Sequence, residues 1–250
     1  KLLRQTPFVD RVRGMLRRVE NVYGIPVDIE FACDGEKFYV LQCRSQSQAE
    51  DAAPVRIPAE VAVQDVVFSA RKFVRTGLIE KVEYVVYVAA EAYDAVPTRE
   101  RRVRLARVIG RINHALPAKS FILVGPGRWG SNDILLGVPV RYADINRCSL
   151  LIEVAQQRDG FAPEVSFGTH FFQDLVEADI QYLPLYPDEP GNHFNREFFH
   201  GSPNALARLL PAEADFAELV RVIHVPEVAH NRHLTVAMDG ETDRALAYLS

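Results

Sequence analysis

The sequence has 250 residues, of which 48% are hydrophobic and 25% are charged, which is typical of a globular protein with a substantial core. Its 29 Lys and Arg residues stand against 33 Asp and Glu, and the formal net charge of −4 argues against a general polyanion-binding protein. No apolar run approaches the roughly 20 residues that span a bilayer. We therefore expect neither nucleic acid nor membrane as a partner.

The cysteines predict the cellular compartment, and the first residues predict that the sequence is part of a longer chain. Cys33, Cys43 and Cys148 form neither a CxxC pair nor an even set of disulfides, which predicts a cytoplasmic protein. The sequence begins at Lys1 and enters a helical pattern at once. We expect it to be the C-terminal portion of a longer protein, with part of a site contributed by the preceding chain.

The first predicted elements are a helix and a hairpin. Thr6-Pro7 begins an apolar stripe of helical period that ends near Tyr23-Gly24. Two alternating runs then flank Asp34-Gly35, which is a strong hairpin signal. The stretch that follows is rich in Ala, Gln, Ser and Pro and has no period. The expected organisation is a first domain over residues 1–48, a linker over 49–59 and a second domain over 60–250.

Strands and helices alternate in the second domain, with a turn expected at Gly77 and a long loop over residues 187–203. Strands are expected at 61–68, 82–89, 121–124, 150–154, 181–185, 221–225 and 234–238, and helices at 98–116, 171–178, 203–210 and 212–220. This mixture without repeats predicts an α/β (α+β) fold.

Four polar residues interrupt the otherwise apolar hairpin: Asp28, Glu30, Gln42 and Arg44. A three-residue loop would place residue 28 opposite residue 42, and all four side chains would then share one face. Carboxylate and amide oxygens suit magnesium, and a guanidinium suits phosphate. The alternative is the wet face of an amphipathic hairpin, and both interpretations stay open on spacing alone.

The two runs Val27-Asp-Ile-Glu-Phe31 and Leu41-Gln-Cys-Arg-Ser45 resemble the closing strands of the ATP-grasp domain in the phosphoenolpyruvate synthase and pyruvate phosphate dikinase family. The resemblance implies ATP and Mg²⁺ as cofactors. It assigns magnesium ligation to Glu30 and Gln42, phosphate contact to Arg44 and a supporting role to Asp28.

In the same family, the ATP-grasp domain is followed by a swivelling domain whose T-x-H motif carries a phosphorylated histidine. Gly168-Thr-His170 resembles that motif, between the strands expected at 150–154 and 181–185. A helix N-terminus would stabilise an added phosphoryl group there. The bulky Phe171 and Phe172 and the missing glycine-rich entry segment depart from the family pattern, and the alternative for His170 is a cap or packing residue.

The stretch Phe121-Ile-Leu-Val-Gly-Pro-Gly-Arg-Trp-Gly-Ser-Asn-Asp133 contains a G-x-G-x-x-G after four apolar residues. A dinucleotide fingerprint needs a helix at its third glycine, whereas turn residues and Pro139 follow here. Two interpretations remain: Arg128 and free backbone N–H groups hold a phosphate or carboxylate, or the loop is a structural corner. Trp129 then contacts a substrate or anchors the loop. Together with the G-T-H-F-F-Q-D-L run, this stretch resembles uncharacterised relatives of phosphoenolpyruvate synthase.

The remaining patterns give little evidence for a functional site. The arginine-rich helix at 98–116 is interpreted as a solvated surface balanced by acidic residues. His230 and His233 lack a third zinc ligand, and His193, His200 and His224 form no recognisable constellation.

The predicted function is the C-terminal portion of a phosphoenolpyruvate synthase-like phosphotransferase. It would use Mg-ATP to phosphorylate pyruvate or another small acceptor through His170, with Arg128 assisting. It would be inactive without the rest of the parent chain, because ATP-grasp catalysis needs both lobes. The alternative is a non-catalytic module that senses a small anion at Arg128 and regulates an attached ATP-grasp kinase.

Overall fold

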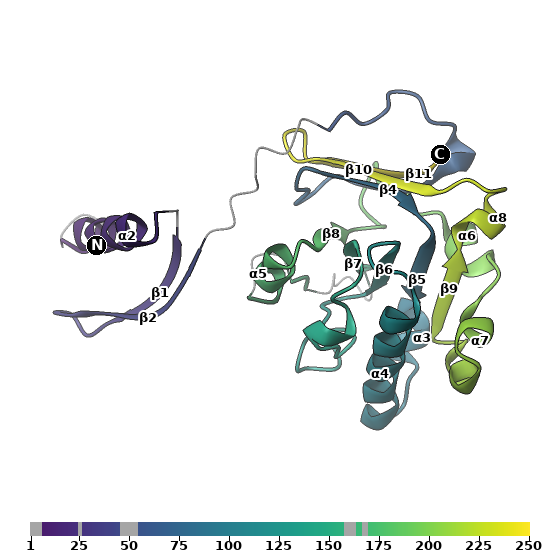
Figure 1. The fold of residues 1–250 in the computed structure, drawn as a ribbon, viewed down its shortest axis with the longest axis horizontal. Helices are drawn as coiled ribbons and strands as arrows, with labels where there is room; N and C mark the ends of the chain where they lie inside the picture. The colour runs from purple at the N-terminus through teal and green to yellow at the C-terminus, as the bar shows by residue number, and fades with distance from the viewer. Residues whose placement is uncertain (1–6, 25–26, 46–54, 158–163, 167–169) are drawn as a thin grey trace. The chain divides into compact units, whose positions relative to one another are not determined.

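The computed structural model describes residues 7–24, 27–45, 55–157, 164–166 and 170–250 (Figure 1). The chain divides into two compact units, Lys1–Asp51 and Ala52–Ser250. Residues 49–54 of the expected linker, and Gly168 and Thr169 of the histidine motif, lie outside the described residues.

The first unit is a helix against a hairpin. It consists of α2 (Phe8–Tyr23), β1 (Val27–Cys33) and β2 (Phe38–Ser45), and β1 and β2 are antiparallel. Gly24 ends the helix with a φ of 72°, a left-handed conformation that glycine adopts without strain. The ring of Phe8 lies 6.1 Å from Phe31 and 5.7 Å from Phe38 between ring centroids, so aromatic packing holds α2 on one face of the hairpin.

The second unit is built on a five-stranded sheet of order β8-β7-β6-β5-β9. Its strands are β5 (Tyr84–Val88), β6 (Phe121–Pro126), β7 (Leu150–Val154), β8 (Gln181–Leu185) and β9 (Val220–His224). The first four strands of that order are parallel and β9 is antiparallel to β5. Strands β6 and β7 are buried throughout, as expected for a parallel sheet that is covered on both faces.

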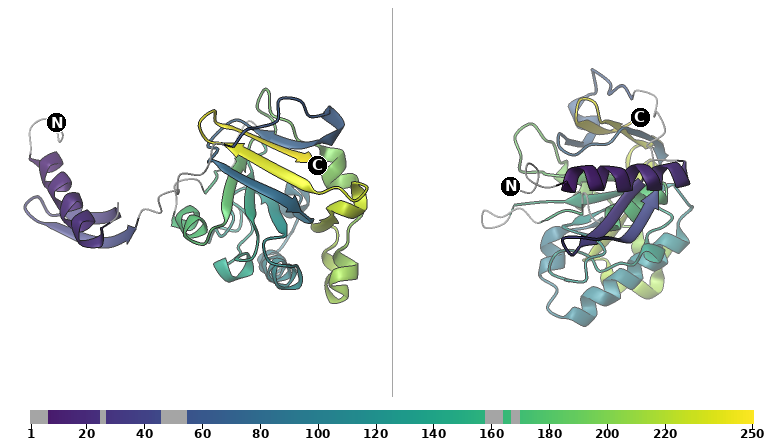
Figure 2. Two further views of the ribbon diagram at one scale, coloured as in Figure 1. Left: turned by 45° about the horizontal axis from the view of Figure 1, so that its top comes forward. Right: turned by 90° about the vertical axis from the view of Figure 1, so that its left-hand side faces the viewer.

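A four-stranded antiparallel sheet of order β3-β11-β10-β4 covers one face (Figure 2). Its strands are β3 (Val66–Ala70), β4 (Gly77–Val82), β10 (Leu234–Asp239) and β11 (Arg244–Leu249). The apolar core between the two sheets includes Phe68, Val85, Ile122, Ile152 and Val236.

Helices cover the opposite face of the five-stranded sheet, so the second unit has three layers (Figure 1). The helices on this side are α3 (Ala90–Asp94), α4 (Arg99–Ala115), α5 (His170–Glu177) and α7 (Leu206–Leu209). Helices α6 (Arg196–Gly201) and α8 (Val225–Val228) instead pack against the core between the two sheets. Short 3₁₀ turns are η1 (Val63–Asp65), η2 (Tyr142–Asp144) and η3 (Pro211–Phe216). Core residues on this side include Leu105, Ile109, Leu123 and Leu151. The expected α/β fold class is confirmed.

No described helix has both the length and the apolar character that a membrane-spanning helix needs.

Candidate functional site

The hairpin of the first unit brings its polar positions together, although not in the predicted register. Glu30 pairs with Gln42 and Asp28 pairs with Arg44, whereas the three-residue loop predicted Asp28 opposite Gln42. The loop is longer, because the last pair is Cys33 with Phe38. That prediction of the register was therefore wrong by two residues.

A β-bulge decides which face these positions occupy. The register shifts between Glu30 and Phe31, since Phe31 pairs with Val40 and Glu30 with Gln42, which leaves Leu41 as the extra residue. Without that extra residue, Glu30 would pair with Leu41, and Gln42 would belong to the other face. Because side chains alternate along a strand, positions 28, 30, 42 and 44 share one face, opposite to the face that Phe31 turns toward α2.

The donor set on this face suits a hard cation beside a nucleotide phosphate. Glu30 is exposed and Gln42 is half-buried, so a carboxylate and an amide oxygen lie on neighbouring strands. The side chains of Asp28 and Arg44 lie outside the described part of the structure. Among the described residues, no group of three His, Cys, Asp or Glu side chains could hold a metal.

In the second unit, the glycine-rich run forms the end of β6 and a loop that folds back on itself. Gly127 has a φ of 57°, and a Cβ there would lie 2.0 Å from the carbonyl oxygen of Leu136. The Arg128 N–H donates to that same carbonyl at 2.7 Å, and the Gly130 N–H donates to Val138 at 2.9 Å. The glycines allow this close backbone approach, and no helix follows them. The motif is not a dinucleotide fingerprint.

Two buried side chains hold the returning arm of this loop. The Tyr93 hydroxyl lies 2.8 Å from the carbonyl oxygen of Ile134 and 2.6 Å from that of Gly137, and its single proton is shared between these two acceptors. Arg102 donates to Ile134 at 3.0 Å, and its guanidinium lies 4.8 Å from the centre of the Tyr93 ring. Burial raises the pKa of Tyr93 to about 12, so its hydroxyl remains a donor at neutral pH.

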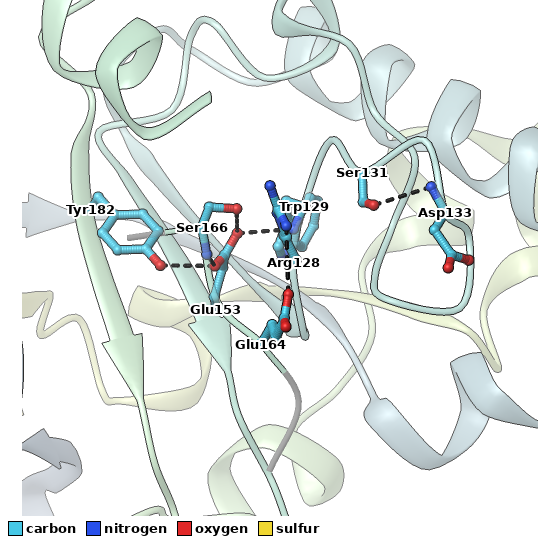
Figure 3. A network of polar contacts seen from close by, with 8 residues as sticks. All are labelled: Arg128, Trp129, Ser131, Asp133, Glu153, Glu164, Ser166 and Tyr182. Carbon is cyan, nitrogen blue, oxygen red and sulfur yellow. Dashed lines mark hydrogen bonds and ion pairs between the residues drawn. The ribbon is translucent and has the colours of Figure 1, made fainter. Parts of the chain in front are cut away.

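The outgoing arm is anchored by Glu153, a fully buried carboxylate on β7 (Figure 3). One oxygen accepts the Trp129 N–H at 2.9 Å and the Ser166 hydroxyl at 2.6 Å. The other accepts the Ser166 N–H and, at 2.7 Å, the Tyr182 hydroxyl. Glu153 therefore ties the loop after β6, the segment before α5 and strand β8 to one point.

Two opposing effects determine the pKa of this carboxyl group. Burial raises the pKa of Glu153, and the hydrogen bonds from Ser166, Tyr182 and Trp129 lower it in part, so that the net shift is upward. Each of its two oxygens accepts a hydrogen bond from a backbone N–H group. Two acceptor oxygens at these positions require a carboxyl group, because an amide has only one.

Trp129 is an anchor of the loop and not a surface for a ligand. Its side chain is fully buried, and a Cβ at Gly125 would lie 2.4 Å from its ring. Gly125 thus leaves the space that the indole fills. The interpretation of Trp129 as a substrate contact was wrong.

The histidine motif lies next to this loop. His170 is the first residue of α5, between β7 and β8, although its side chain lies outside the described part. The ring of Phe171 packs against Gly130, where a Cβ would lie 2.7 Å from it. Arg128 pairs with the exposed Glu164 at 3.6 Å, and about a third of the Arg128 side chain is exposed (Figure 3). The structure therefore brings the Arg128 loop and the start of α5 into contact.

The basic helix α4 uses its arginines within the fold. Arg101 and Arg104 each lie 5.1 Å from the centre of the Phe216 ring, and Arg104 pairs with Asp215 at 3.6 Å. Arg111 pairs with the buried Glu213. These contacts account for much of the charge of the helix.

Residues 5–65 match the family described as pyruvate phosphate dikinase, AMP/ATP-binding domain. The resemblance of the first unit is confirmed. The match includes the hairpin and runs on to Asp65 at the end of η1 in the second unit, and it supports ATP as a ligand. Comparison with curated proteins and with solved structures gave no match.

Glu153 is the residue that sequence reasoning missed. Its signal is present, because it is the one charged residue in Leu150-Leu-Ile-Glu-Val154, a strand that is otherwise apolar. An acidic residue in such a strand must find several donors, because burying a carboxylate without partners is costly.

Proposed function

We propose that this chain takes part in ATP-dependent phosphoryl transfer: its hairpin contributes to a Mg-ATP site, and His170 carries the phosphoryl group to a small acceptor such as pyruvate. The observation that carries the proposal is the direct pairing of Glu30 with Gln42 in a segment that matches an AMP/ATP-binding domain.

The hairpin supports nucleotide binding through its bulge. The extra residue in β2 aligns two oxygen ligands, at positions 30 and 42, and sets Arg44 opposite Asp28 on the same face. Magnesium, when bound, would neutralise phosphate charge. Glu30 and Gln42 would hold it, and Arg44 would pair with phosphate oxygens.

For the transfer step, a neutral ring nitrogen of His170 would attack a phosphorus atom of ATP. A P–N bond forms, the P–O bond to the departing nucleotide phosphate breaks, and the acceptor oxygen later takes the phosphoryl group and frees the histidine. The start of α5 supplies backbone N–H groups toward added negative charge. Ser166, four residues before His170 in the sequence, is anchored on Glu153.

A second candidate function is anion sensing at Arg128 without catalysis. The Arg128 side chain is partly exposed, its backbone is held in a rigid loop, and its pairing with Glu164 at 3.6 Å is of a kind worth little in water. A phosphate or carboxylate could replace Glu164 there.

Labelling separates the two functions. The full-length protein is incubated with ATP labelled at the β- or γ-phosphate and then tested for acid-labile protein-bound label. The wild type and the control His114→Ala, an exposed residue at the end of α4, should be labelled, and His170→Ala should not. Equal labelling of all three proteins, or of none, would contradict the phosphohistidine and favour the sensing function.

A further inference from the structure

A group of polar side chains meets at the carboxyl end of β5, apart from the Glu153 network. Tyr87 comes from β5 and Glu91 from the first turn of α3. Gln156 follows β7, and Arg196 and His200 come from α6. Ligands of open α/β sheets bind outside the carboxyl ends of the strands, where connections leave toward opposite faces. Here α3 packs on the helical side and α6 packs in the core between the two sheets.

A buried tyrosine holds the histidine of this group. The Tyr87 hydroxyl and His200 Nε2 are 3.2 Å apart, and the two rings meet edge to face at 5.3 Å between centroids. Only 4% of Tyr87 is exposed, and burial raises its pKa, so the hydroxyl stays protonated. Tyr87 therefore orients the imidazole of His200, a residue that is itself exposed.

The group contains more positive than negative charge: the guanidinium groups of Arg196 and Arg221 stand against the one carboxylate of Glu91. Arg196 lies 3.9 Å from Glu91, with both side chains 56% exposed, and Gln156 donates to the same carboxylate at 3.2 Å. An ion pair this long and this exposed holds Arg196 only weakly. Arg221, paired with Tyr87 across β5 and β9, adds a second guanidinium whose Nε is buried and has no acceptor in the described part of the chain.

We propose that Arg196 and His200 form a binding site for the phosphate or carboxylate group of a small molecule. The guanidinium offers a fork of donors to two oxygens, and the oriented imidazole offers a further contact. Glu91, which also accepts a hydrogen bond from Gln156, holds Arg196 loosely until the anion replaces it.

The site is separate from the Arg128 loop but shares its edge of the sheet. Strands β5 and β7 flank β6, and at about 4.8 Å between neighbouring strands they lie about 10 Å apart. An anion at Arg196 would thus be bound one strand away from the loop after β6. The proposal does not depend on phosphorylation of His170, and labelling of His170 tests that step alone.

The test is a titration of the chain with inorganic phosphate at constant ionic strength, followed through the ring resonances of its histidines by NMR. His200→Gln assigns the His200 signal. Wild type should give a saturable shift of that signal, and Arg196→Gln should weaken the binding at least about tenfold. The matched control is Arg208→Gln, which removes an exposed arginine of α7 that pairs with Glu227.

Two results would overturn the proposal. One is a shift of the His200 signal that does not saturate, or that Arg196→Gln leaves unchanged, because phosphate is then only an adventitious ion. The other is loss of the shift in Arg128→Gln with Arg196→Gln unaffected, because the anion then belongs to the loop after β6. Arg196→Lys keeps the positive charge but loses the forked pair of donors. Its affinity for phosphate should lie between that of wild type and that of Arg196→Gln.

Discussion

Glu153 is the residue on which the second unit's candidate site depends. Its two oxygens each accept one backbone N–H, from Trp129 and from Ser166. A glutamine amide cannot reproduce this arrangement, because whichever way it is turned its NH₂ group faces one of those N–H donors. The carboxyl group is therefore required by geometry.

Glu153→Gln should lower the free energy of unfolding by about 1–3 kcal/mol, the usual cost of a buried donor without an acceptor. The fluorescence of Trp129, the single tryptophan, reports urea unfolding at this loop. Glu164→Gln removes a carboxylate that is 76% exposed and serves as the control, with an expected change below about 0.5 kcal/mol. Equal effects of the two substitutions would contradict the role given to Glu153.

The raised pKa of Glu153 also sets the sign of a pH dependence. Since the folded state holds this proton more tightly than the unfolded state, the contribution to stability is greatest below the ordinary glutamate pKa. It is lost as the pH rises through the folded pKa. The wild type should therefore lose stability over that interval relative to Glu153→Gln, which has no proton to release there.

At the scale of elements, the hairpin and the glycine-rich loop show what a pattern predicts and what it does not. Alternation identified β1 and β2, but the turn and the bulge that set their register depend on local hydrogen bonds. The Asp34 side chain accepts from the N–H groups of Glu36 at 2.9 Å and Lys37 at 2.8 Å, which favours the longer turn. Composition alone does not determine that choice.

In the second unit, strands β7 and β8 were predicted with their observed bounds because they are short, mostly apolar runs. Helix α4 was predicted within one residue at each end, because its buried residues follow a helical period and Thr98 caps it. Gly77 was expected in a turn but begins β4, where it packs against the side chains of Gln181 and Met238. Helix α6 and strand β11 were missed. Strand β11 pairs with the neighbouring β10 and with the distant β3, and α6 packs in the core between the two sheets.

Gly127→Ala tests the loop after β6 as an element. A methyl group at a φ of 57° and 2.0 Å from a carbonyl oxygen forces the backbone to move. We expect a loss of more than about 1 kcal/mol in the free energy of unfolding and a shifted Trp129 emission, because Trp129 follows two residues later. Unchanged stability together with an unchanged spectrum would show that the loop does not need this conformation.

At the scale of the whole molecule, the two units differ in how much core they contain. The second unit has two apolar cores, one on each face of its parallel sheet. The first has a helix with no fully buried side chain and a hairpin with exposed Tyr39, Val40 and Leu41. Core size favours independent folding for the second unit only.

Residues 52–250 expressed alone should therefore unfold in one cooperative transition. Their melting temperature should lie within a few degrees of the one that Trp129 fluorescence reports for residues 1–250. Calorimetry and fluorescence measure this. A broad or missing transition would mean that the second unit needs the first.

The division of the chain also explains which parts of the site could be predicted. The residues of the hairpin are local, so a short motif and its family pattern identified Glu30, Gln42 and Arg44 as candidates. The contacts of Ser166 with Glu153 and of Phe171 with Gly130 join residues from different parts of the chain, which meet only in the folded sheet. The same holds for Tyr87 and His200, which are far apart in sequence and 3.2 Å apart in space.

The affinity of the full-length protein for Mg-ATP, measured by isothermal titration calorimetry, tests the proposed nucleotide site most directly. Glu30→Gln should weaken binding at least about tenfold, or ~1.4 kcal/mol, because a ligand charge is removed. Glu36→Gln makes the same change in the exposed turn of the same hairpin and should leave the affinity unchanged. Equal affinity of wild type and Glu30→Gln would contradict the assignment of the hairpin to the Mg-ATP site.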